Sequence, residues 1–376
     1  MTSEKEVADL KTYLGKLADL EGSDLYLTVG AVPVAKVADK LVPLSELTLT
    51  PSDMERLTAS FFTSRRMEEF DKKPELDVAE SVPGKGRFRI NIYRQRGSLG
   101  LAARRIKFGI PTFDDLGLPQ VLKKLAEMRQ GLLCVTGATS SGKSSTLAAM
   151  VDHRNSTLPG HILTIEDPIE FFHEHKASVV SQREVGSDTA SYADALKSAL
   201  RQAPDLLLIG EIRDKETTEA ALHFAETGHL VFATVHATNA SQTVDRLVHM
   251  FPPEQFEQAC LLLSLNLGGV ITQRLVPTKD GDGRVAAIEI LVPTARIRDL
   301  IKEGDMDAVF EAMREMSGTE GIQTFDDALH KLASDKQITE EQAIAYSDVP
   351  NDLRIRFRVD KGDEGKEVEK IRLAKD

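Results

Sequence analysis

The pattern of apolar and polar positions differs between the first hundred residues and the rest of the chain. The first part mixes helical spacing with short alternating runs, and Thr50 and Pro51 together signal the start of a helix. Helices are predicted at residues 4–20 and 51–62, and strands at residues 24–30, 32–42 and 87–94. We therefore predict a small α+β domain over residues 1–110, with a hinge at the glycine and proline of residues 109–112.

From about residue 115, helical and strand patterns alternate along the chain. Strands are predicted at residues 132–136, 161–165, 205–209 and 230–235, and helices at residues 144–154, 191–202 and 214–227. This alternation favours a parallel sheet covered by helices, so we predict an α/β domain over residues 111–352. The apolar run at residues 261–271 is too short to span a bilayer, and we expect it to form a core helix of this domain.

Residues 353–376 form a separate, highly charged end of the chain. Between positions 353 and 359, four apolar side chains alternate with three arginines. That period predicts a strand with one apolar and one cationic face. We expect this strand either to cover the second domain or to recruit a partner that carries acidic residues.

Side chains that follow the predicted parallel strands should meet at one edge of the sheet, where such sheets bind their ligands. The first strand leads into residues 137–144, Gly-Ala-Thr-Ser-Ser-Gly-Lys-Ser, which match the pattern of a phosphate-binding loop. Lys143 supplies a cation for the β and γ phosphates of a nucleotide, and the Ser144 hydroxyl reaches Mg²⁺. The alternative is a Gly/Ser turn with a surface lysine. The residues predicted to bind the nucleotide are Gly137, Ala138, Thr139, Ser140, Ser141, Gly142, Lys143, Ser144 and Ser145.

Carboxylates follow two further strands. Glu211 comes after the apolar run at 205–209, the place from which an acid holds Mg²⁺ directly or through water. The alternative for Glu211 is a cap for the next helix. Glu166, Asp167 and Glu170 follow another strand and compete for the role of orienting or deprotonating the attacking water. Their spacing does not choose among them.

Two histidines and several arginines are further candidates. His236 follows its strand and can contact the γ-phosphate, whereas His229 precedes the strand and should lie toward the far end. Either histidine alone is more often a packed or solvated residue. The cations that could act on the transition state, in the same subunit or in a neighbouring one, are Arg87, Arg89, Arg104 and Arg105, with ordinary surface charge as the alternative.

Composition narrows the class of protein. The chain has 376 residues and two cysteines, too few for a disulfide framework or a cysteine zinc site. A net charge of -12 argues against a general affinity for nucleic acid. The start of the chain lacks a signal-peptide pattern, and no apolar run is long enough to span a membrane. We therefore expect a cytoplasmic protein with at most peripheral membrane contact.

Five motifs together are similar to those of the secretion-type ATPase superfamily, and within it to type IV pilus retraction ATPases of the PilT/PilU family. In chain order they are the phosphate loop, Ile165-Glu-Asp-Pro-Ile-Glu-Phe171, Gln182-Arg-Glu-Val-Gly186, Gly210-Glu-Ile-Arg-Asp214 and Thr227-Gly-His-Leu-Val-Phe-Ala-Thr-Val-His236. The resemblance covers nearly the whole chain. It implies an N-terminal PAS-like domain and a RecA-like motor domain that hydrolyses ATP with Mg²⁺.

The same resemblance implies roles for individual residues. Glu170 matches the catalytic glutamate of the family's aspartate box, Glu211 its Walker B acid, and His229 and His236 its histidine box. It also implies a homo-hexameric ring with ATP between subunits, docked on a pilus platform protein at the cytoplasmic face of the inner membrane. A companion retraction ATPase of the PilT type is a further implied partner.

The chain also departs from the family pattern. Ser140 stands where the family usually has a glycine, and residues 296–301 read Arg-Ile-Arg-Asp-Leu-Ile where PilT members have Ala-Ile-Arg-Asn-Leu-Ile. The extended end from Asn351 is more similar to PilU, so we expect an accessory retraction motor. The alternatives are a pilus assembly or type II secretion ATPase, which generally carries a tetracysteine zinc site, a nucleic-acid translocase of related fold, and a ring that binds ATP without using it.

Overall fold

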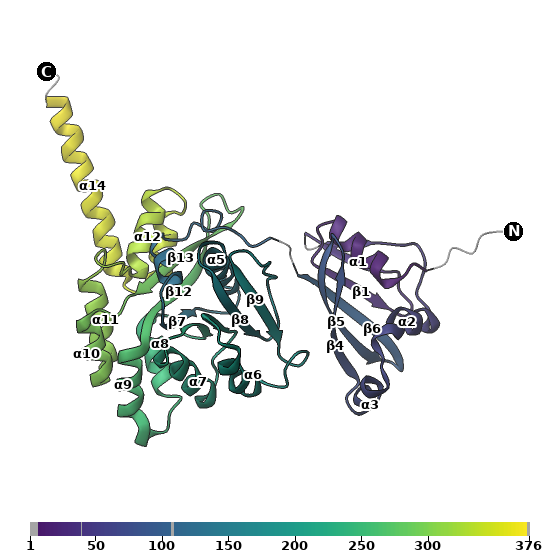
Figure 1. Ribbon diagram of the computed structural model, residues 1–376. Coiled ribbons are helices and arrows are strands. Elements are labelled where there is room, and N and C mark those ends of the chain that lie inside the picture. The colour runs from purple at the N-terminus through teal and green to yellow at the C-terminus, as the bar shows by residue number, and fades with distance from the viewer. Residues whose placement is uncertain (1–6, 39, 107–108, 374–376) are drawn as a thin grey trace. The chain divides into compact units, whose positions relative to one another are not determined.

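The chain divides into two units, residues 1–109 and 110–376 (Figure 1). The computed structural model describes residues 7–38, 40–106 and 109–373. Strands of the first unit form one sheet in the order β3-β2-β1-β6-β5-β4. Its helices and strands are α1 (Leu10–Asp19), β1 (Asp24–Thr28), β2 (Val34–Val37), β3 (Lys40–Pro43), α2 (Pro51–Thr58), α3 (Ser64–Lys72), β4 (Glu75–Val82), β5 (Gly86–Gln95) and β6 (Ser98–Ile106).

The local sequence explains where several helices and strands of the first unit begin and end. The Thr50 hydroxyl accepts a hydrogen bond from the backbone N–H of Asp53, and the Asp53 carboxylate accepts one from the Thr50 N–H. This capping box fixes the start of α2 where Pro51 predicts it. The alternating pattern at 87–94 is a strand of the sheet, as expected. The predicted strand at 32–42 is two strands, β2 and β3, which pair antiparallel with each other. The helix predicted at 4–20 begins later, at Leu10.

The second unit contains a sheet in the order β13-β12-β7-β11-β10-β8-β9, with helices around it (Figure 1). Its elements up to the middle of the sheet are α4 (Val121–Ala126), β7 (Gly131–Thr136), α5 (Lys143–Thr157), β8 (Gly160–Glu166), β9 (Ser178–Glu184), α6 (Tyr192–Ala199), β10 (Leu206–Ile209), α7 (Lys215–Glu226) and β11 (Leu230–Val235). The remaining elements are α8 (Ala240–Val248), α9 (Phe256–Asn266), β12 (Leu267–Pro277), β13 (Arg284–Leu291), α10 (Ala295–Glu303), α11 (Met306–Glu315), α12 (Phe325–Ser334), α13 (Glu340–Tyr346) and α14 (Pro350–Leu373).

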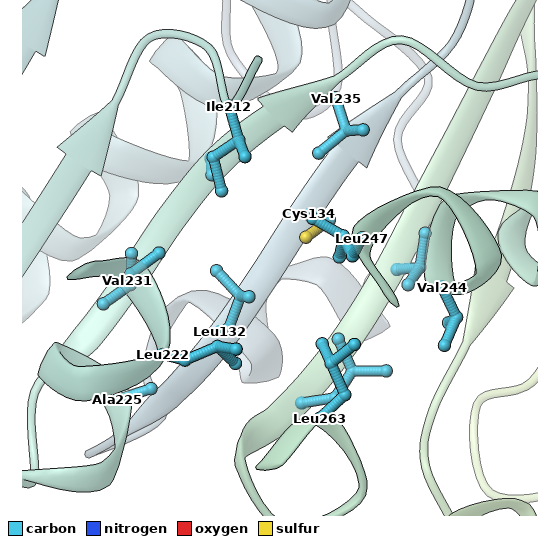
Figure 2. Close-up of a cluster of buried hydrophobic side chains, with 14 of the residues drawn as sticks. Leu132, Cys134, Ile212, Leu222, Ala225, Val231, Val235, Val244, Leu247 and Leu263 are labelled. Atoms are coloured by element: carbon cyan, nitrogen blue, oxygen red, sulfur yellow. The ribbon is translucent and has the colours of Figure 1, made fainter. Parts of the chain in front are cut away.

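Strands β7, β8, β10 and β11 are parallel, as their alternation with helices predicts. Their side chains are almost entirely buried because helices cover the sheet. Figure 2 shows part of one core layer, in which Leu132 and Cys134 of β7 and Val231 of β11 face apolar side chains of α7, α8 and α9. The predicted α/β class is confirmed, and the parallel strand ends meet at one edge.

Two predictions about the second unit are wrong. The apolar run at 261–271 is not one helix: α9 ends at Asn266, and β12 begins at Leu267 beside β7. Gly268 and Gly269 stand at the change, and a Cβ built on either would lie 3.1 Å from a neighbouring atom, so the strand packing there leaves little room for a side chain. Leu265, expected in the core, is exposed.

Residues 353–359 are helical and do not form a strand. Helix α14 begins at Pro350, whose fixed φ suits the first turn of a helix. Leu353 and Phe357 are buried one helical turn apart, and Phe357 stacks on His330. Ile355 and Val359, which a strand would place beside them on one apolar face, are 59% and 56% exposed. The alternating run therefore folds as a helix with one anchored face.

None of the described helices is long and apolar enough to cross a membrane.

Candidate active site

The ends of four parallel strands surround one cavity of about 180 Å³. The phosphate loop follows β7, and the acidic segment 166–170 begins at the last residue of β8. Gly210 and Glu211 follow β10, and His236 follows β11. The chain positions these groups because parallel strands present their carboxyl ends on the same edge. The convergence predicted from the sequence is therefore present in the structure.

The phosphate loop has the backbone that its sequence requires. Gly137 and Gly142 have φ angles of 139° and 91°, which side-chain-bearing residues rarely adopt. Helix α5 begins at Lys143, so its unpaired N–H groups and its dipole point into the loop. The Lys143 ammonium donates to the carbonyls of Gly137 and Ala138, at 2.9 and 2.8 Å. The lysine is thereby held across the loop, where a phosphate would meet it.

One further observation fits an anion in this loop. The buried Ser141 hydroxyl has no hydrogen-bond partner among the described residues. A polar atom in that position is normally paired, so it is available to a ligand. Ser140, which replaces the usual glycine, has a left-handed φ of 63°. The serine thus adopts a conformation that costs a non-glycine residue about 1 kcal/mol, and the loop keeps its shape in spite of it.

Glu211 lies between Arg213 and His236. Its carboxylate contacts His236 at 3.1 Å and the Arg213 guanidinium at 2.5 Å. Partial burial would raise the pKa of Glu211, but the Arg213 hydrogen bond and the charges of Arg213, His236 and Lys143 outweigh it and lower the pKa. The side chain is therefore an anion, the form in which a carboxylate binds a metal ion.

The three acidic residues at and after the end of β8, Glu166, Asp167 and Glu170, have different surroundings. The Glu166 carboxylate accepts hydrogen bonds from Thr164 at 2.6 Å and from Gln182 at 3.3 Å, and from the backbone N–H of Glu170. Burial raises the pKa of Glu166 despite these bonds. Asp167 precedes Pro168 at a cis peptide bond and is exposed. Glu170 is exposed at the cavity wall, and no protein partner of its carboxylate is found in the described part of the chain. The Glu166 carboxylate is thus hydrogen-bonded within the protein, whereas the Glu170 carboxylate is accessible to a ligand.

His229 lies away from this cavity. It precedes β11, its imidazole contacts the Phe224 carbonyl and the Thr227 hydroxyl, and it lines a different cavity together with Arg129 and Arg154. Within one chain, His229 and His236 therefore do not share a site, as the position of His229 before the strand predicts.

The four candidate arginines belong to the first unit, and the sheet register separates them. Arg89 of β5 pairs with Arg104 of β6, and Arg87 lies two residues from Arg89, so these three share a face of the sheet. Arg104 forms an ion pair with Asp24 at 2.8 Å. Arg105 lies on the other face, beside the core, and donates to the carbonyl of Ala18 at the end of α1. The structure therefore separates Arg105 from the other three candidates, because strand residues alternate between faces.

Sequence reasoning missed several residues that shape the cavity. Tyr192 and His173 line it, and burial raises the pKa of Tyr192 and lowers that of His173 to about 4, so both are neutral. A Cβ on Gly210 would lie 2.7 Å from the Tyr192 hydroxyl, which explains the glycine before Glu211. Neither Tyr192 nor His173 lies directly after a strand, so the rule that located the other residues could not find them.

This arrangement is that of a phosphate-loop nucleotide hydrolase, and comparisons with known proteins define the class more narrowly. A family model described as type II/IV secretion system protein matches residues 112–343. The type IV pilus ATPase PilU of Pseudomonas aeruginosa is 43% identical over 351 residues, which cover 93% of this chain and 92% of that protein. The type IV pilus retractation ATPase PilT of the same species is 41% identical over 345 residues, 92% of this chain and 100% of that protein.

Solved structures agree. A crystal structure of the pilus retraction motor PilT with bound ADP matches with a TM-score of 0.85 at 42% identity, over 93% of this chain and 99% of that one. The ATPase DotB of Legionella pneumophila matches with a TM-score of 0.78 at 28% identity, over 91% and 96% of the two chains. The chain therefore belongs to the type II/IV secretion system protein family, and within it to the type IV pilus retraction ATPases of the PilT/PilU family. The resemblance predicted from the five motifs is confirmed.

Proposed function

We propose that this protein hydrolyses ATP with Mg²⁺ to power the retraction of type IV pili, as the accessory motor of the PilU type. The observation that carries the proposal is the meeting of Lys143, Glu170 and Glu211 at one cavity. Likeness to PilU over nearly the full length of both chains supports the specific assignment. A phosphate-binding cation and two carboxylates at one cavity support this proposal, because ATP hydrolysis needs groups of these types close together.

Each side chain has a chemical task in this proposal. Lys143 and the N-terminus of α5 bind the phosphates, and Ser144 and Glu211 would hold Mg²⁺, which neutralises charge on the phosphate oxygens. Glu170 orients the attacking water or accepts its proton, because its carboxylate is exposed at the cavity wall. Glu166 holds the segment around Glu170 through its own hydrogen bonds.

The test uses cells of the source organism that lack this gene, with and without the gene of a second retraction ATPase. We expect retraction to weaken when this gene is lost, to stop when both are lost, and pili to persist. Re-expressed wild-type protein should restore retraction. A Lys143→Ala variant should fail to restore it, because the phosphate cation is missing. Loss of all pili would instead indicate an assembly ATPase, and ATPase activity of the purified protein that DNA stimulates would indicate a translocase.

The proposal extends to partners. By likeness to PilU and PilT, the chain would form a homo-hexamer that binds a pilus platform protein at the cytoplasmic face of the inner membrane, beside a companion PilT-type ATPase. Helix α14 offers a surface for that companion. Its anchored side is fixed by Leu353, Phe357 and the ion pair of Arg356 with Asp327, and its outer side exposes Arg354, Ile355, Arg358 and Val359.

We expect the double variant Arg354→Glu/Arg358→Glu to keep its ATPase activity and to lose most co-purification with the companion. Charge reversal at two exposed positions leaves the buried side of α14 intact, while it repels an acidic partner. Binding of the wild-type protein should also weaken as salt rises. The matched control, Lys331→Glu/Lys336→Glu, changes exposed charges at neighbouring α12 and the loop after it, and should bind normally. Equal binding by all three proteins would contradict a docking role for α14.

A further inference from the structure

Gln273 of β12 lies against the phosphate loop at two points and against helix α5 at a third. Its backbone carbonyl would lie 2.4 Å from a Cβ on Gly137, and its Nε2 would lie 2.6 Å from a Cβ on Gly142. The Thr146 hydroxyl, in the first turn of α5, donates to its Oε1 at 2.6 Å. Gln273 is only 3% exposed, so these contacts form in a region with little water. One residue therefore contacts both ends of the loop and the helix that follows it.

The residues beside Gln273 hold its strand in place. Thr136, the last residue of β7, donates from its hydroxyl to the Thr272 hydroxyl at 2.9 Å. On the other side, Arg274 donates to Asp348 at 2.7 Å and to the carbonyl of Tyr346 at 2.8 Å, and lies over the Phe325 ring at 3.8 Å. Thus β12 is joined to the strand before the loop and to the C-terminal helices, and its position sets that of Gln273.

We propose that Gln273 is a positioning residue of the nucleotide site. From strand β12, its side chain holds the phosphate loop in the shape that binds the nucleotide. The inference rests on the proposed function, in which this loop binds ATP. Two glycines with positive φ make the loop conformationally permissive, and such a segment needs outside contacts to favour one shape. The amide packs where a side chain at 142 would stand, and its oxygen fixes the first turn of α5 through Thr146.

The test is Gln273→Met in the full-length protein, which keeps the length of the side chain and removes its polar atoms. We expect the KM for ATP to rise about tenfold, with kcat changed less than KM, because a loop held less firmly binds substrate and transition state alike more weakly. The matched control is Gln323→Met. Gln323 donates to the carbonyl of Ile288, which lies opposite Gln273 in the β12–β13 pair, and its amide has no hydrogen bond to the loop among the described residues. Gln323→Met should therefore lower Tm and leave KM unchanged.

A second variant separates positioning from stability. In Thr146→Val/Gln273→Met, both partners of the hydrogen bond are apolar, so no buried hydroxyl is left unpaired and Tm should recover toward the wild-type value. The KM should stay high, since the amide that packs on Gly142 is still absent. Recovery of KM together with Tm would overturn the positioning role, and so would a folded Gln273→Met protein with wild-type KM.

Lys143→Ala, measured beside these variants, distinguishes this inference from the proposed function. We expect it to lose ATP binding. If Lys143→Ala bound ATP normally, the loop would not be the nucleotide site and both proposals would fail. If Lys143→Ala lost binding while Gln273→Met kept the wild-type KM, only the role of Gln273 would be refuted.

Discussion

Replacing Glu170 with Gln should lower the turnover of ATP by on the order of 10² to 10⁴ and leave ATP binding in place. The substitution keeps the size of the side chain and removes the carboxylate that would orient or deprotonate the attacking water. Binding should persist because the phosphate contacts come from Lys143 and the start of α5. Phosphate release measures turnover, and a fluorescent ATP analogue measures binding.

Two controls sharpen this result. Glu174→Gln makes the same chemical change four residues later, at a side chain outside the cavity, and should hydrolyse ATP like the wild type. Glu166→Gln should reduce turnover less than Glu170→Gln, since an amide oxygen can still accept from Thr164 and Gln182. Wild-type turnover by Glu170→Gln, or a larger loss in Glu166→Gln, would assign the water to a different acid.

The sequence predicts the parallel strands and the site residues that follow them, because both depend on local patterns. A buried parallel strand appears in the sequence as an apolar run, and the loop that follows β7 carries a motif with fixed spacing. The sequence does not determine which of Glu166, Asp167 and Glu170, at the end of β8, orients the attacking water. Spacing leaves the choice open, because it depends on which carboxylate the protein itself hydrogen-bonds, and Thr164 and Gln182 reach Glu166 only in the folded structure.

The wrong prediction of a strand at residues 353–359 has a physical origin. Alternation over 353–359 also places residues four apart, the spacing of one helical face, so a strand and a helix both satisfy it. Packing of Phe357 against His330 favours the helix, and a pattern on α14 alone cannot show that contact. The role proposed for Gln273 was missed for the same reason, since a lone glutamine in an apolar strand carries no local signal.

Removing Arg87 or Arg89 should lower ATP turnover by on the order of 10³, if the proposed ring places one of these cations on a neighbour's nucleotide. Both lie on the sheet face opposite the core of the first unit, where β5 presents them in register two residues apart. Arg104 shares this face but is paired with Asp24, so we expect a smaller loss there. Phosphate release by Arg→Gln variants measures the effect.

Mixed rings show whether the cation acts between subunits. A ring of Arg89→Gln and Lys143→Ala chains, each inactive alone, would contain an intact pair at about one interface in four when the chains mix at random. Activity should therefore return in part. Arg105 provides the internal control: it lies beside the core and donates to Ala18, so Arg105→Gln should lower stability and gain nothing from mixing. If neither the Arg87 nor the Arg89 variant regained activity in rings shown to be mixed, the cation would not act in trans, and the arginine face of β5 would be surface charge.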